Sequence, residues 1–552
     1  MTLRKQLKAG VARVAPAVLG LSAFISLGAA TALAQDTPTA SDFLNAASDP
    51  TNWILPAKSY SGNHYTPATQ INPGNVGGLH LAWKTTLDDP GPMENSPIVY
   101  NGTMYVTTAH DHVYALDAAT GKVKWEVTDN PHVIAFAANR GIGLMDGNVY
   151  VGTLDGHLIA LNAQTGQKVW DKVTVKDTAN SFYTMAPVPY HDPGTGKDML
   201  LLGVSNGDWG GNGDITAYDP KDGSVIWSWT SIPGPGEPGH DSWSGDSWKR
   251  AGGSMWGGAT IDPATHTLYL NVGNPTPDFL GTVREGDNLY TDSMIALDIS
   301  GPQPKLKWYH QFIPRDTHDW DPPMQPILFS GKVGNNEEKL VATGDKAGNY
   351  WLLDAETGKL VDHTAIAFQK GYNTPPSLQG NYACPNTLGG VEYQGGAYDP
   401  ATNTVFLPSQ NECGFWTASK EAVYIAGQFY IGGAFPKLVG PDTGQMNAID
   451  VSTGVFNWRH HFNLPNYGGA LVTASGLVFS GNLGGTENAF DTKTGNILWS
   501  YDTGAYIQAP SEAYEANGQE YIVVASGQAG NALIPELPAK GQPAIISAFT
   551  LK

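Results

Sequence analysis

Charge and cysteine are both scarce in this chain. Only 15% of its 552 residues are charged, and 31 Lys and Arg face 51 Asp and Glu, which gives a net charge of −20. So acidic a surface disfavours nucleic acid and anionic membranes as partners. The only two cysteines, Cys384 and Cys413, are too few for a cysteine metal site, and the sequence has no C-x-x-C-H segment to attach a c-type haem.

Long apolar runs are also missing, except near the N-terminus. There, basic residues between positions 4 and 13 precede an apolar stretch over 18–30 and the small residues of 32–34. This order predicts a signal peptide over residues 1–34, a mature chain over 35–552 and export to the periplasm. The stretch is shorter than the ~20 residues that span a bilayer, and no membrane span is expected in the mature chain. Losing four basic residues would change the net charge from −20 to −24.

Glycine and tryptophan, in contrast, are abundant, with 66 and 16 residues, and this composition is typical of many short strands joined by tight turns. One phrase recurs: a small residue, an apolar residue, Asp or Asn, then Gly and finally Trp. Its copies cover residues 115–125, 160–170, 217–227, 296–308, 448–458 and 489–499, with Asp362 replacing Trp in a copy over 352–362 and a half-copy ending at Trp83. Eight units at this spacing predict an all-β, eight-bladed β-propeller in a single domain over 35–552.

The residues of the phrase suggest how each unit is built. Asp followed by Thr-Gly forms a tight turn, because the Asp side chain accepts hydrogen bonds and Gly tolerates a positive φ. The Trp of the next strand is a large plate that can pack between neighbouring sheets. We expect the final strand, residues 544–551, to complete the blade opened near Trp83 and so close the ring.

The most unusual local segment is residues 314–321, which holds the three carboxylates Asp316, Asp319 and Asp321. With the Trp repeat, it makes the chain resemble the PQQ-dependent alcohol dehydrogenases of the quinoprotein methanol and ethanol dehydrogenase type, without a haem domain. The resemblance covers the mature chain and implies pyrroloquinoline quinone (PQQ) and a metal ion as cofactors. It assigns the catalytic base to Asp319. The interpretation as a plain solvated acidic turn stays open.

The resemblance also implies a set of metal ligands. Asp208 matches the position of the family's carboxylate ligand, Asn274 matches its Asn ligand, and Asp319 would complete the set. Hard oxygen ligands suit Ca²⁺, which we expect first. Asp321 adds a charge that a trivalent lanthanide ion would prefer, so a lanthanide stays open as well.

The predicted quinone pocket follows from the same resemblance. Trp256 would lie beneath the cofactor ring, Arg140 would bind a cofactor carboxylate, and Lys346 would bind the quinone oxygens as a catalytic residue. The remaining predicted contacts are Glu94, Thr184, Ser254, Glu392 and Tyr467.

Two cysteine positions separate this chain from many family members. A pair of adjacent cysteines lies above the quinone in those members, and here the positions hold Ile134 and Ala135. Cys384 and Cys413 match a second family disulfide, and an oxidising compartment also favours their pairing.

The implied activity is oxidation of a primary or bulky secondary alcohol by hydride transfer to PQQ, with Asp319 accepting the hydroxyl proton and the metal acting as a Lewis acid. With no haem segment in the sequence, the electrons would pass to a separate acceptor such as a soluble cytochrome c. Two alternatives stay open: a PQQ-dependent sugar dehydrogenase, and a non-enzymatic propeller scaffold for envelope protein assembly. No residue identifies the alcohol.

Overall fold

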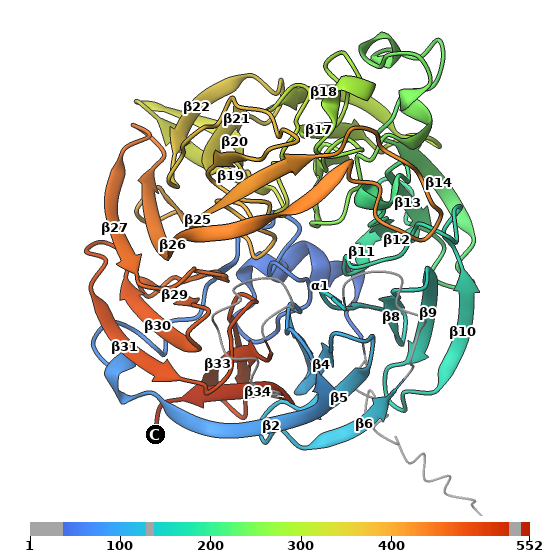
Figure 1. Ribbon diagram of the computed structural model, residues 1–552. Helices are drawn as coiled ribbons and strands as arrows, with labels where there is room; N and C mark the ends of the chain where they lie inside the picture. Colours follow the sequence, from blue (N-terminus) through green and yellow to red (C-terminus); the bar gives the residue numbers. More distant parts are fainter. Residues whose placement is uncertain (1–36, 129–136, 529–542) are drawn as a thin grey trace, which may run out of the picture. The chain divides into compact units, whose positions relative to one another are not determined.

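Eight sheets surround a common centre in the ribbon of Figure 1. The computed structural model describes residues 37–128, 137–528 and 543–552, and all of these belong to one compact unit. The predicted all-β, eight-bladed propeller is therefore confirmed. The predicted signal peptide over 1–34 and the pair Ile134 and Ala135 lie outside the described residues.

Blades 1 to 4 follow the chain in order. Blade 1 holds β3 (Ile98–Tyr100), β4 (Thr103–Thr107), β5 (Val113–Asp117) and β6 (Val123–Val127). Blade 2 holds β7 (Gly143–Met145), β8 (Asn148–Gly152), β9 (His157–Asn162) and β10 (Lys168–Val173). Blade 3 holds β11 (Val188–His191), β12 (Asp198–Gly203), β13 (Asp214–Tyr218) and β14 (Val225–Thr230). Blade 4 holds β15 (Ala259–Asp262), β16 (Thr267–Val272), β17 (Ser293–Asp298) and β18 (Lys305–Gln311).

Blades 5 to 8 complete the ring. Blade 5 holds β19 (Ile327–Val333), β20 (Asn336–Gly344), β21 (Asn349–Asp354) and β22 (Leu360–Ala365). Blade 6 holds β23 (Asn381–Ala383), β24 (Ala397–Asp399), β25 (Thr404–Ala418), β26 (Gly433–Asp450) and β27 (Phe456–Phe462). Blade 7 holds β1 (Tyr65–Thr66), β28 (Gly468–Thr473), β29 (Leu477–Gly481), β30 (Thr486–Asp491) and β31 (Ile497–Asp502). Blade 8 joins β32 (Glu512–Ala516), β33 (Gln519–Ser526) and β34 (Pro543–Thr550) to β2 (His80–Pro90).

The two ends of the described chain meet in blade 8. β2 pairs antiparallel with β34, with His80 opposite Thr550 and Leu87 opposite Ala544. This pairing is the predicted closure of the ring. It removes the free edges that an open array of sheets would expose.

Strand sequence reflects position in each blade. The outer strand β2 alternates, with Trp83 and Leu87 buried and Lys84 and Asp88 exposed, because one face packs on the neighbouring sheet and the other meets solvent. The inner strand β8 is buried over four of its five residues. The apolar cores therefore lie between blades.

The repeated Trp joins six of the blades to the blade that follows. The indole Nε1 donates to a backbone carbonyl of the next blade over 2.9–3.3 Å. The pairs are Trp83 with Ala118, Trp125 with Ala163, Trp170 with Pro220, Trp308 with Ala355, Trp458 with Thr492 and Trp499 with Leu79. These bonds hold neighbouring blades together where their faces pack.

The Gly of the phrase receives the Trp of the preceding blade. Thr120 donates its backbone N–H to Asp117 Oδ1 over 3.0 Å, and Gly121 follows with a φ of +70°. A Cβ on Gly121 would lie 2.3 Å from Cε3 of Trp83. Glycine is thus required at position 121 for two reasons: the turn needs a positive φ, and the Trp83 indole leaves no room for a Cβ.

The helices are short, and two of them precede the first strand. They are α1 (Ala40–Asn45) and the single 3-10 turns η1 (Ala46–Ser48), η2 (Val76–Gly78), η3 (Gly207–Trp209), η4 (His240–Ser242), η5 (Ser247–Arg250) and η6 (Gly281–Val283). Among the described residues, no helix is long and apolar enough to cross a membrane.

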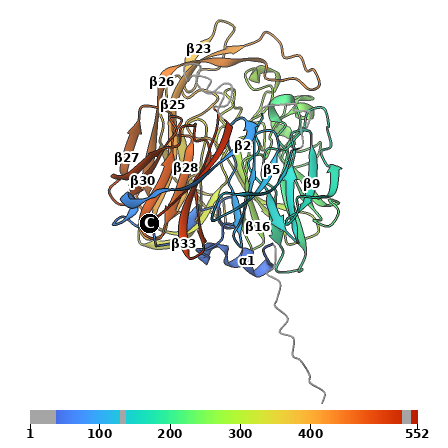
Figure 2. The ribbon, with the colours of Figure 1, turned by 90° about the horizontal axis from the view of Figure 1, so that it is seen from below.

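The strands β25 and β26 are much longer than the others and project beyond one face of the ring, opposite the face that carries α1 (Figure 2). Cys413 of β25 forms the expected disulfide with Cys384, which follows β23. The predicted disulfide is therefore confirmed.

Candidate cofactor and metal site

A cavity of about 480 Å³ opens beside the β25–β26 extension. This volume lies in the range of small-molecule and cofactor sites. Eleven of the predicted site residues line it, from loops that join strands within and between several blades: Glu94, Arg140, Thr184, Asp208, Ser254, Trp256, Asn274, Asp319, Lys346, Glu392 and Tyr467. The remaining predicted residue, Asp321, lies just beneath the lining.

The segment 314–321 connects β18 to β19 and is held by its first carboxylate. Asp316 accepts the backbone N–H groups of His318 and Trp320 over 2.9 and 2.8 Å. The His318 ring stacks on Trp320 with centroids 4.0 Å apart. Asp319, between them, has a φ of +60°, a strained conformation that the tight loop imposes. The loop is thus rigid, and it is not the solvated turn of the alternative interpretation.

Asp319 and Asp321 converge on a single ammonium group. Lys346, in the turn between β20 and β21, places its Nζ 2.9 Å from Asp319 Oδ1 and 2.9 Å from Asp321 Oδ1. The other oxygen of Asp321 accepts the indole N–H of Trp256 over 3.2 Å. Asp321 is fully buried, so its carboxylate points into the site rather than into solvent.

Burial sets the electrostatics of this group. It raises the pKa of Asp319 well above its usual range, against the attraction of the Lys346 ammonium. Burial lowers the pKa of Lys346, but the carboxylates of Asp319 and Asp321 outweigh this and hold the pKa well above its usual value. Burial also raises the pKa of Glu392 to about 8. Lys346 therefore stays charged and fixes the acidic pair.

Asp208 lies in the turn η3 and lines the same cavity. Its Oδ1 accepts the side-chain N–H of Asn274 over 3.4 Å. Burial raises its pKa, the Lys346 ammonium lowers it, and the Asp321 carboxylate raises it further. Among the described residues, no three acidic, His or Cys side chains already form a close metal cluster.

A buried excess of carboxylate nevertheless fits a cation. Asp208, Asp319 and Asp321 act on one another and on the single ammonium of Lys346. Three carboxylates and one ammonium leave a net charge of −2 when all are ionised. Uncompensated charge of this kind is costly in a buried site. The donor set of carboxylate and amide oxygens suits hard cations such as Ca²⁺.

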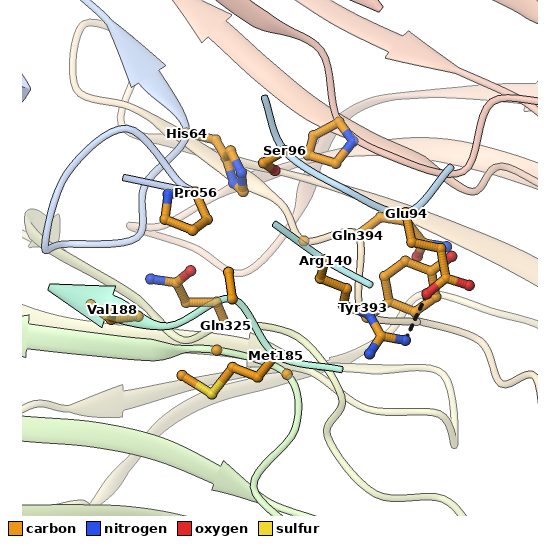
Figure 3. A pocket seen from close by; sticks show the side chains of 15 residues that line it. Pro56, His64, Glu94, Ser96, Arg140, Met185, Val188, Gln325, Tyr393 and Gln394 are labelled. Carbon is orange, nitrogen blue, oxygen red and sulfur yellow. Dashed lines mark ion pairs between the residues drawn. The ribbon is translucent and has the colours of Figure 1, made fainter. Parts of the chain in front are cut away.

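Arg140 lines the large cavity and also a small neighbouring cavity, in which Figure 3 shows its ion pair with Glu94. Its guanidinium pairs with Glu94 Oε2 at 2.8 Å and donates to Thr184 Oγ1 over 2.6 Å. It lies 4.2 Å from the ring centroid of Tyr393 and 4.8 Å from that of Trp256. Among the described residues, Arg140 Nε is buried without a hydrogen-bond partner. A spare buried donor beside a flat indole fits an anionic planar ligand such as PQQ.

Ser254 and Tyr467 lie on other parts of the wall. Ser254 is buried, lies two positions before Trp256 in the sequence and lines the cavity. The buried Tyr467 hydroxyl donates to the carbonyl of Leu388 over 3.3 Å and to Glu412 Oε2 over 3.4 Å. Its hydroxyl is thus directed to the protein, and the ring forms part of the wall.

Some cavity residues were not predicted from the sequence. Tyr393 stacks on Arg140 and also lines a second cavity of about 50 Å³, which shares Glu94, Arg140 and Tyr393 with the large one (Figure 3). The aromatic side chains of Phe182, Trp209 and Phe435 form a further wall. Their place in the fold, rather than a motif, brings them there.

Comparisons with known proteins agree with this site. The family described as glucose, ethanol and alcohol dehydrogenases with a PQQ β-propeller domain matches residues 53–365 and 361–522. The quinoprotein alcohol dehydrogenase PedH of Pseudomonas putida is 31% identical, over 93% of this chain and 91% of its own. A lanthanide-dependent methanol dehydrogenase of Methylacidiphilum fumariolicum is 30% identical, over 96% of this chain and 92% of its own.

Solved structures show the same likeness. The quinohemoprotein alcohol dehydrogenase ADHIIG of Pseudomonas putida superimposes with a TM-score of 0.83 at 27% identity, over 94% of this chain and 82% of its own. A europium-containing methanol dehydrogenase gives 0.82 at 27% identity, over 93% of this chain and all of its own. Sequence, fold and cavity together place this chain in the family of PQQ-dependent quinoprotein alcohol dehydrogenases.

Proposed function

We propose that the protein oxidises a primary or secondary alcohol to an aldehyde or ketone with metal-bound PQQ in this cavity. The observation that carries the proposal is the meeting of Asp319, Lys346 and Trp256 at one site: Lys346 pairs with both Asp319 and Asp321, and Asp321 accepts the indole N–H of Trp256. It combines a proton acceptor, a fixed positive charge and a flat aromatic face.

Each residue has a definite task in this proposal. Bound PQQ would accept the hydride, and the metal would polarise the quinone. Asp319 would accept the proton of the substrate hydroxyl, and Lys346 would hold that carboxylate in place over 2.9 Å. Trp256 would support the cofactor ring, and Arg140, Thr184 and Ser254 would bind its polar edge.

The proposed metal ligands are Asp208, Asn274, Asp319 and Asp321. When all are ionised, the three carboxylates and Lys346 carry a net charge of −2, which matches a divalent ion, so we propose Ca²⁺ first. The buried carboxylate of Asp321 supports a lanthanide ion as the alternative. One relative is named as lanthanide-dependent, and one solved relative contains europium.

The alternatives fit the site less well. A propeller that serves only as a scaffold has no use for buried carboxylates around one lysine. A sugar dehydrogenase would need polar partners for many hydroxyl groups, whereas Phe182, Trp209, Phe435 and Leu438 line the wall. The wall therefore supports an alcohol.

We infer that the chain is exported and that residues 35–552 form the mature domain. The basic, apolar and small residues of 1–34 support this, together with the disulfide. We further propose a separate electron acceptor, such as a soluble cytochrome c.

The test is reconstitution. Purified protein would be given PQQ with Ca²⁺ or with a light lanthanide, and alcohol-dependent reduction of a dye would be measured. We expect turnover that requires both PQQ and metal. A protein that binds both and does not oxidise alcohols, whether or not it oxidises sugars, would contradict the proposal.

A further inference from the structure

An aromatic wall leads from the proposed metal site to the rim of the cavity. Trp209 directly follows Asp208, lines the cavity and is 4% exposed. Its ring packs on Phe182 with centroids 5.1 Å apart and on Phe429 at 4.4 Å. Phe429 in turn packs on Phe435 at 5.1 Å, and Phe435 lines the cavity while 40% exposed. The four rings form one packed aromatic cluster, of which Phe182, Trp209 and Phe435 line the cavity.

The outer part of this aromatic wall belongs to the β25–β26 extension and is fastened to the ring. Tyr430, between the two strands, donates its backbone N–H to the carbonyl of Asp208 over 2.6 Å. Gly427 donates its backbone N–H to Asn180 Oδ1 over 3.0 Å, and Phe279 donates its own to the carbonyl of Ile431 over 2.8 Å. The wall is thus built before any substrate arrives, which lowers the ordering cost of binding.

The wall is placed to hold the side group of a substrate. A substrate hydroxyl at Asp319 faces the charged end of the cavity, where Asp208 and Lys346 lie. The group attached to the carbinol carbon must then extend away from these charges. Trp209, next in sequence to Asp208, begins the surface available to it.

We propose that the substrate is an alcohol with an aromatic group, and that Phe435 is a specificity-determining residue that packs against this group. Rings on this wall can meet a substrate ring edge to face or offset, the arrangements that aromatic pairs prefer. This inference rests on the proposed function and narrows its substrate class.

The experiment compares benzyl alcohol, ethanol and glucose with the reconstituted holoenzyme. We expect kcat/KM for benzyl alcohol to exceed that for ethanol by about ten-fold or more, and glucose to be a poor substrate. Phe435→Ala should lower kcat/KM for benzyl alcohol about ten-fold while ethanol changes less than about two-fold. Phe435→Leu keeps an apolar side chain without the ring. Its kcat/KM for benzyl alcohol should lie between those of the parent enzyme and of Phe435→Ala.

Phe415→Ala is the matched control. Phe415 lies on β25, is 46% exposed and is not among the described residues that line the cavity. It should leave the ratio of the two alcohols unchanged. Equal losses at Phe415 and Phe435, a Leu variant with the parent ratio, or preference for ethanol or glucose would overturn the inference. Absence of turnover with every alcohol would instead overturn the proposed function.

Discussion

The Asp319 carboxylate is held 2.9 Å from the Lys346 ammonium, in a loop whose backbone is strained at that residue. Strain at one residue persists only where its surroundings over-determine the conformation, and such residues cluster at active sites. Here Asp316, His318 and Trp320 supply those surroundings. The residue is therefore positioned before substrate or cofactor binds.

Replacing Asp319 by an asparagine separates the proposed base from the shape of the site. The amide keeps the volume of the carboxylate but cannot accept a proton at neutral pH. We expect kcat of Asp319→Asn to fall about 10²- to 10⁴-fold, with PQQ still bound. Stopped-flow dye reduction and the absorbance of bound PQQ would measure the two effects. Asp88→Asn, at an exposed position on β2, should keep the parent rate, and an Asp319→Asn enzyme as fast as its parent would exclude Asp319 as the base.

Substitution of Asp321 tests which metal ion the site uses. Its buried carboxylate contacts Lys346 and Trp256, and it contributes one of the three negative charges at the site. Asp321→Ala should remove activation by a light lanthanide and leave most of the Ca²⁺-dependent rate. Titration of both metals into the apo variant, with dye reduction as readout, checks this. If the variant responds to both metals as its parent does, Asp321 does not discriminate between them.

Residue identity was easier to predict than residue pairing. The resemblance to the family predicted the positions that line the cavity, because the matching segments lie between the repeats in the expected order. It could not predict which way Asp321 points, since its partners Lys346 and Trp256 come from segments far apart in the chain. Tyr393 and Phe435 were missed as site residues for the same reason, because tertiary packing alone brings them to the cavity.

At the scale of elements, the Trp repeat predicted the blades and their number. The prediction was possible because each copy of the repeat contains, within a few residues, the turn, the strand and the Trp that packs on the next sheet. The length of β25 and β26 could not be predicted, because the phrase contains no information about segments inserted between copies. That extension is what carries Phe435 to the cavity.

Two glycines of one blade allow the cost of a positive φ to be measured apart from the cost of contact with the Trp83 indole. Gly121 and Gly102 have φ angles of +70° and +72° in the same blade, but a Cβ would meet Trp83 at Gly121 and no described atom within 4 Å at Gly102. Both Ala variants carry the backbone strain, of about 1–2 kcal/mol. Gly121→Ala should cost about 1–3 kcal/mol more in free energy of unfolding, because the indole must move. Urea denaturation of both variants measures the difference, and equal costs would show that the indole contact adds nothing.

At the scale of the whole molecule, closing the ring creates the site. The pairing of β2 with β34 and the bonds from Trp499 to Leu79 and from Trp83 to Ala118 connect the last blade to the first. The cavity is lined by segments from many blades, from Pro90 to Gln528, so no single blade could form it. Cofactor binding should therefore require the closed propeller.

The stoichiometry of PQQ binding tests most directly whether this cavity is the PQQ site. Apo protein would be titrated with PQQ by equilibrium dialysis, with and without Ca²⁺, alongside the Trp256→Ala variant. We expect one PQQ to bind per chain, and to bind more tightly when the metal is present. We expect much weaker binding to the variant, because it lacks the aromatic face. No saturable binding, or equal binding by parent and variant, would contradict the assignment of this cavity as the PQQ site.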